Sequence, residues 1–127
     1  MNKALYGLVT ALSLALASPA LAEGDVAAGE KVFKKCKACH AVGEGAKNKV
    51  GPQLNGIAGK AAGEDESFKY SKGMLAAAEE GLTWDDETLA AYLTKPKEVV
   101  PKTKMSFAGL RKEADVANVI AYLKTFE

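Results

Sequence analysis

The chain has few residues that usually bind metals through sulfur or imidazole. Only two cysteines and one histidine occur among 127 residues. A structural zinc site takes four ligands and usually draws a second Cys or His pair from elsewhere in the chain. No such pair is left here once the first cluster is counted, so a structural zinc site is excluded.

An excess of charge of one sign and a strand-like pattern are also missing. The 17 basic and 16 acidic residues nearly cancel, which gives no overall case for nucleic acid binding. No segment alternates convincingly between apolar and polar residues over the length of a strand. The chain also has no repeat, linker or low-complexity tract. We therefore expect one small all-α domain.

The first 22 residues have the features of a secretory signal peptide. Lys3 is positive, residues 4–17 are apolar, and residues 20–22 read Ala-Leu-Ala, a small-x-small cleavage pattern. The apolar run is short for a retained membrane helix. We expect residues 1–22 to be cleaved, so that residues 23–127 form the mature domain in the periplasm. Without Lys3 the basic residues number 16, equal to the 16 acidic ones.

Both cysteines and the histidine fall within five consecutive positions, Cys36-Lys37-Ala38-Cys39-His40. A disulfide between the cysteines is plausible in an oxidising compartment, but its loop is tiny and it leaves His40 unexplained. A thioredoxin-like dithiol needs a βαβ setting that this pattern does not predict. C-x-x-C-H is the spacing of covalent haem attachment, in which two thiols add to the vinyl groups and the imidazole binds iron. Covalent haem is the interpretation that uses all three residues.

An electron-carrying haem iron needs a second axial ligand, and the candidates are Met74 and Met105. Met74 lies in a short predicted helix, where methionine more often fills the core. Met105 lies in the irregular, proline-flanked stretch "VPKTKMSF", which can wrap round the face opposite His40. We favour Met105 over Met74, and less strongly over an open or lysine-ligated iron. A thioether ligand raises the reduction potential.

Four helices follow from capping residues and apolar periodicity. The first is capped by Asp25 and carries the cluster at its end, and the second spans about 71–80. The third begins after Thr83, which can cap it, and stops at Pro96. A non-helical stretch follows, and a last helix covers about 112–125. The loop after the cluster is rich in glycine and longer than usual, as expected if short helices and loops wrap around a large apolar group.

Three stretches of the sequence resemble one known family. They are "GEKVFKKCKACHAVGEGAKNKVGPQLNGIAGK", "LTWDDETLAAYLTKPKEVVPKTKMSFAGL" and "DVANVIAYLKTF". In order and content they resemble class I cytochromes c, in particular the bacterial cytochrome c2 type related to mitochondrial cytochrome c. The resemblance spans essentially all of residues 23–127. It implies the small cytochrome c fold, four to five short helices and long loops around one covalent haem c.

The resemblance also implies roles for single residues. Cys36 and Cys39 would hold the haem, with His40 and Met105 as axial ligands. The remaining implied contacts are the Pro52 carbonyl to the His40 imidazole, Tyr70 and Trp84 to a haem propionate, Tyr92 and Thr103 on the Met105 side, and Gly29 and Phe33 packed on the last helix near Tyr122. Where many relatives place an arginine near the propionates this chain has Lys60, which lacks the bidentate fork.

The family implies a soluble carrier of single electrons, not an enzyme, that shuttles between a quinol:cytochrome c reductase and a terminal oxidase or photosynthetic reaction centre. Charge falls in three blocks, basic, acidic and basic, over residues 31–49, 64–87 and 95–112. Both basic blocks flank the expected iron ligands, so their lysines should ring the haem edge and steer acidic partners. The candidates are Lys35, Lys37, Lys47, Lys49, Lys95, Lys97, Lys102 and Lys104. The alternatives are a haem enzyme with an open iron position and a sensor that exchanges Met105.

Overall fold

The computed structural model describes residues 23–127, so the expected signal peptide at 1–22 lies outside the described residues. Within these described residues five helices occur in this order: α1 (Val26–Phe33), α2 (Lys72–Glu79), α3 (Asp86–Thr94), α4 (Pro96–Val99) and α5 (Glu113–Leu123). Within residues 23–127 the only strand-like pairing is an isolated bridge between Ala61 and Thr83. The predicted all-α class is confirmed.

The first helix begins at the predicted cap, Asp25, and the second begins within one residue of the predicted start, with Ser71 as its cap. The Asp25 carboxylate accepts a hydrogen bond from the backbone N–H of Ala28, and the Ser71 hydroxyl accepts one from Met74. The third helix is present as predicted, but its predicted cap was wrong. Asp85, not Thr83, caps α3, and its carboxylate accepts from the Thr88 N–H at 2.7 Å. Each of these side chains satisfies a backbone donor that the first turn leaves without a partner.

The sequence predicted a non-helical stretch after α3, but the structure has a short helical turn there. Pro96 ends α3 and also starts the single turn α4, in which it occupies the first position. Proline is well tolerated there, because the first turn of a helix does not use that backbone N–H. The side chain of Pro96 is buried, and Val100 just after α4 is fully buried. The turn therefore carries the chain from α3 into the loop that leads to Met105.

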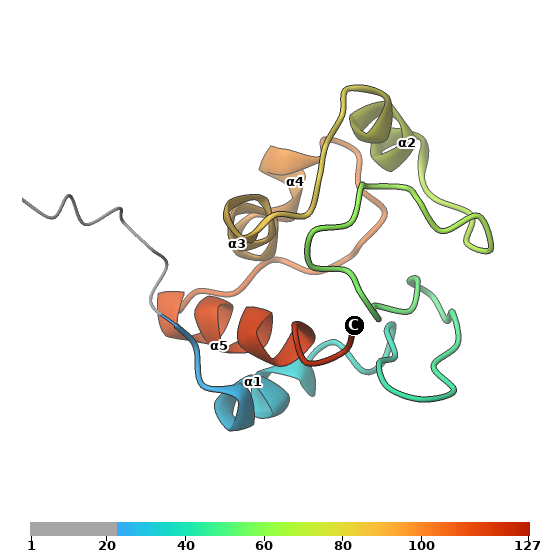
Figure 1. Ribbon diagram of the computed structural model, residues 1–127. Coiled ribbons are helices and arrows are strands. Elements are labelled where there is room, and N and C mark those ends of the chain that lie inside the picture. The colour runs from blue at the N-terminus through green and yellow to red at the C-terminus, as the bar shows by residue number, and fades with distance from the viewer. Residues whose placement is uncertain (1–22) are drawn as a thin grey trace, which may run out of the picture.

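The helical core is built on the crossing of α1 and α5, with α3 packed against α5 (Figure 1). Phe33 of α1 and Val119 of α5 are each 1 % exposed, and the Phe33 ring lies 5.5 Å from that of Tyr122. A Cβ at Gly29 would collide with the Asn118 carbonyl, so the two backbones touch where glycine stands. Gly29 and Phe33 thus pack on the last helix as predicted.

Long loops form the other side of the molecule. Figure 1 shows residues 40–70 passing beside the helices, with α2 above them. Among the described helices α2 packs closely against no other helix. No helix within residues 23–127 has the length and apolar character needed to cross a bilayer.

Candidate functional site

The C-x-x-C-H cluster lies on tight turns that continue from α1. The helix ends at Phe33, three residues before Cys36, so the cluster follows the helix and is not part of it. The Cys36 N–H donates to the Phe33 carbonyl at 2.8 Å, and the His40 N–H donates to the Cys36 carbonyl at 2.9 Å. These bonds keep the helical sense of the chain, and they anchor both thiols and the imidazole to one rigid segment.

Both cysteines are free thiols of intermediate exposure. Burial raises the pKa of the Cys36 thiol, the nearby Cys39 raises it further, and Lys35 opposes both. A thiol with a raised pKa stays protonated at neutral pH and is a weak nucleophile. The pair is therefore not a pre-activated dithiol of the thioredoxin kind.

The His40 imidazole is oriented by the chain segment that follows it. The Nδ1 atom lies 2.7 Å from the Pro52 carbonyl oxygen. Because a carbonyl only accepts, Nδ1 carries the hydrogen and donates, which leaves Nε2 with its lone pair. Burial lowers the pKa of His40, and the bond to Pro52 partly offsets this effect. The ring is thus kept neutral, the form that ligates metals.

Gly51 is a site residue that the sequence reasoning missed. A Cβ at this position would collide with Cε1 of His40 and would lie 2.8 Å from Nδ1. The Gly51 N–H also donates to the Cys39 carbonyl at 2.9 Å. The imidazole therefore rests against bare backbone, which only glycine provides. The position of this glycine directly before Pro52 was a usable signal, because the carbonyl partner of His40 needs close backbone approach.

The expected sixth ligand lies in a loop fastened to α3. The Tyr92 hydroxyl is 2.9 Å from the Thr103 hydroxyl, and the Met105 N–H donates to that same Thr103 oxygen at 3.3 Å. Burial raises the pKa of Tyr92, and the bond to Thr103 opposes the rise. These contacts join Tyr92 and Thr103 to the backbone at Met105, and their role toward a haem stays a prediction.

Met74 and Met105 both pack against the core and are both partly buried. Met74 differs in its setting, because it belongs to α2 and its backbone N–H is bonded to the Ser71 cap. Met105 lies outside any helix. The assignment of Met105 as the ligand stays a prediction.

The aromatic residues expected at a propionate lie on two separate loop segments, Tyr70 before α2 and Trp84 before α3. The Tyr70 hydroxyl accepts from the Asp65 N–H at 3.2 Å, and its ring meets that of Phe68 edge-on. Trp84 is 6 % exposed, and its ring centre lies 4.9 Å from that of Tyr92. Lys60 pairs through its backbone with Trp84. Their roles toward a propionate stay predictions.

Two loops that border the site are joined by side chains that the sequence analysis did not single out. The Asn48 amide donates to the Ser67 hydroxyl at 3.0 Å, and that hydroxyl donates to the Asp65 carboxylate at 2.5 Å. Hydrogen bonds from Ser67 lower the pKa of Asp65. Single Asn, Ser and Asp residues are common in loops, so nothing in the sequence predicts that these three pair.

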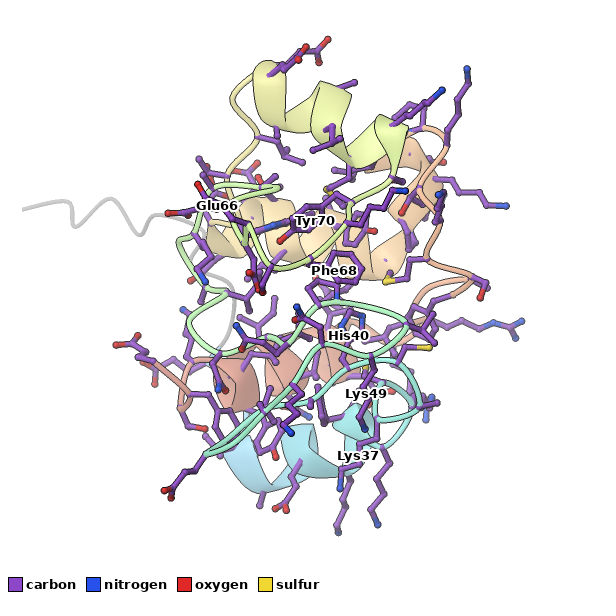
Figure 2. All side chains as sticks on the ribbon, turned by 90° about the vertical axis from the view of Figure 1, so that its right-hand side faces the viewer. Lys37, His40, Lys49, Glu66, Phe68 and Tyr70 are labelled. Atoms are coloured by element: carbon purple, nitrogen blue, oxygen red, sulfur yellow. The ribbon has the colours of Figure 1, made fainter. Side chains whose placement is uncertain are left out.

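All eight lysines predicted to dock partners are exposed. In Figure 2 Lys37 and Lys49 lie below His40, whereas Glu66 lies toward the upper part of the same view. The Lys49 ammonium donates to the Lys37 carbonyl at 3.2 Å, and Lys95 forms an exposed ion pair with Glu98 at 3.5 Å. The side chains of Lys49 and Lys95 therefore already have a partner within the chain. The role of the eight lysines in docking stays a prediction.

The donors at this site fit a covalently attached haem. Two free thiols and a neutral imidazole share one segment, and bare backbone at Gly51 gives the imidazole room. Partly buried apolar side chains from the loops and from α3 pack against the core, including those of Leu54, Ile57, Leu93 and Phe107. Such side chains suit contact with a large apolar macrocycle.

Comparison with known proteins gives a consistent result. The family model described as cytochrome c matches residues 26–127. A cytochrome c2 from Afifella marina is 57 % identical over 105 residues, covering 82 % of this chain and 85 % of that protein. The structure of cytochrome c2 from Rhodospirillum centenum matches with a TM-score of 0.77 and 44 % identity, covering 81 % of this chain and 98 % of that one. Cytochrome cH from Methylobacterium extorquens matches with a TM-score of 0.73 and 47 % identity, covering 80 % and 99 %.

Proposed function

The chain belongs to the cytochrome c family, and from that premise we propose that it carries single electrons in the periplasm with a His/Met-ligated haem c. Members of this family transfer electrons and are not enzymes, and they bind haem covalently. Cys36 and Cys39 match the attachment motif. His40 and Met105 are the proposed axial ligands.

The observation that carries the proposal is the orientation of the His40 ring. Its Nδ1 is bonded to the Pro52 carbonyl at 2.7 Å, so Nε2 is the nitrogen left to bind iron. A hydrogen bond of this kind fixes the ring and raises its basicity as a ligand. His40 also directly follows Cys39, so attachment of the haem and ligation of its iron use the same turn.

When bound, the haem supplies an Fe(III)/Fe(II) couple, and a thioether ligand favours the ferrous form and raises the potential. On the protein side, Tyr92 and Thr103 hold the backbone at Met105. With Met105 in place the iron would have no position open to substrate, which suits a carrier.

We place the mature protein, residues 23–127, in the periplasm after removal of residues 1–22, and we propose that it works as a monomer. Its proposed electron donor is a quinol:cytochrome c reductase, and its acceptor is a terminal oxidase or photosynthetic reaction centre. The exposed lysines of the two basic blocks would attract acidic surfaces on these complexes. Such steering weakens with salt, since charges are screened beyond about 8 Å at physiological ionic strength.

The test is the rate at which a membrane quinol:cytochrome c reductase reduces the haem-loaded protein at several ionic strengths. Lys97 is an exposed member of the proposed docking set, whereas the exposed Lys69 belongs to the acidic block. Lys97→Glu should slow reduction at least about threefold at low salt, and Lys69→Glu makes the same charge change as a control. A reduction rate that does not depend on ionic strength, or equal slowing by the two variants, would contradict the docking proposal.

A further inference from the structure

Helix α2 contacts the loop that leads to Met105, and its Met74, Ala77 and Ala78 also pack against the buried core. It packs closely against no other described helix. Its N-terminal turn instead meets the backbone of Pro101 and Lys102, and the contact is made at Gly73. The backbone contact at Gly73 therefore couples α2 directly to the Met105 loop.

The approach at Gly73 leaves no room for a side chain. A Cβ at this position would collide with the Pro101 carbonyl oxygen and would lie 3.0 Å from that of Lys102. Both obstacles are backbone atoms, which cannot swing away as the end of a flexible side chain can. The backbone of Gly73 is helical, and Gly73 is not among the glycines with a positive φ. Space, not conformational freedom, is what requires glycine here.

The loop facing Gly73 is itself under strain. Lys102 has φ of +64°, and it is the only described residue other than glycine with a positive value. Residues with a Cβ avoid this left-handed region. On its far side the loop is tied to α3 through Thr103, whose hydroxyl also accepts from the Met105 N–H. The loop is thus fixed between α3 and α2.

We propose that Gly73 is a positioning residue for Met105: the flat surface of α2 at Gly73 keeps the backbone of residues 101–102 in the strained conformation that places the methionine. The inference rests on the proposed ligation of iron by Met105. Gly73 itself touches neither ligand nor, on this account, the cofactor. It acts by limiting where the loop can move.

The Gly73→Ala variant distinguishes an effect on the Met105 loop from an effect on the stability of α2, because the two effects have opposite signs. Alanine is favoured over glycine within a helix, so α2 alone should become more stable. A methyl pressed against the carbonyls of 101–102 should displace the loop and weaken the bond to Met105. The cost of overpacking, about 1–3 kcal/mol, corresponds to about a tenfold change or more in the equilibrium between the bound and displaced methionine.

The experiment uses the ferric, haem-loaded protein and measures two quantities. One is the weak near-infrared charge-transfer band of methionine-ligated haem, and the other is the affinity for added imidazole, which must displace the methionine. Gly73→Ala should weaken the band and raise the imidazole affinity about tenfold. Lys102→Gly added to Gly73→Ala should bring the affinity back toward that of the wild type, because a glycine at 102 lets the backbone yield.

The matched control is Ala76→Gly, an exposed position of the same helix. It should lower the stability of α2 and leave the imidazole affinity within about twofold of the wild type. If Gly73→Ala stays within twofold of the wild type while the wild type shows the band, the inference is wrong and the proposed ligation stands. A wild type without the band would overturn the ligation by Met105 and the inference with it.

Discussion

The contact between Gly51 and His40 gives the sharpest test of how this fold holds its histidine. We expect Gly51→Ala to displace the imidazole, because the new methyl would lie 2.8 Å from Nδ1 and 2.9 Å from Nε2. The Nδ1 atom of the same ring donates to the Pro52 carbonyl at 2.7 Å. We expect a shift of the ring away from the new methyl to disturb this hydrogen bond.

Two costs contribute to the expected loss of stability. Forcing an extra methyl into a packed site costs about 1–3 kcal/mol. Losing the hydrogen bond of His40 to Pro52 costs about 1 kcal/mol more. The free energy of unfolding should therefore fall by about 2–4 kcal/mol, a large share of the roughly 5–15 kcal/mol typical of a small domain.

The assay is equilibrium unfolding of the haem-loaded protein in urea, with the absorption spectrum recorded to follow ligation of the iron. Gly45→Ala serves as the control, because this glycine has no neighbour within reach of a Cβ and only its φ of +75° opposes a side chain. Strain alone should cost about 1–2 kcal/mol there and leave the spectrum unchanged. If Gly51→Ala cost less than about 0.5 kcal/mol with an unaltered spectrum, the reasoning about this contact would fail.

Three further predictions concern the core, the Met105 loop and the pH dependence. Phe33→Ala should lower the free energy of unfolding by about 3–5 kcal/mol in urea titrations, because this ring is 1 % exposed; a loss below 1 kcal/mol would contradict its place in the core. Tyr92→Phe should cost about 1 kcal/mol and weaken the near-infrared band, since it removes the bond to Thr103; an unchanged band would argue against that link. The pKa of Asp65 is lowered by hydrogen bonds from Ser67, so the stability it contributes is present above the usual carboxyl pKa and is lost as the pH falls below it. Ser67→Ala should raise that pKa toward 3.8, as an NMR titration of the carboxyl would show.

Local signals predicted the helices well and their ends less well. Asp25 could be recognised as a cap because it precedes an apolar periodic segment. Thr83 was expected to cap the third helix on the spacing of a capping box, but Asp85, two positions later, is the cap. The choice depends on where the chain enters α3, which is set by the backbone pairing of Trp84 with Lys60. That pairing is not visible in the local sequence.

The site shows the same division between local and long-range signals. The attachment motif and the carbonyl partner of His40 could be predicted, because their residues form compact patterns that resemble a known family. Gly73 could not be distinguished from the other glycines of the chain, and Gly51 only by its position directly before Pro52. Their importance comes from close approach to His40 and to residues 101–102. Such contacts arise only when segments distant in sequence meet.

We propose that the chain carries a covalent haem ligated by His40 and Met105. Absorption spectra of the purified ferric protein, recorded beside those of Met105→Ala and Met74→Ala, test this ligation. We expect the near-infrared band in the wild type and in Met74→Ala, its loss in Met105→Ala, and haem that stays attached to all three chains after denaturation. Haem that is released on denaturation, or a band that survives in Met105→Ala and disappears in Met74→Ala, would contradict it.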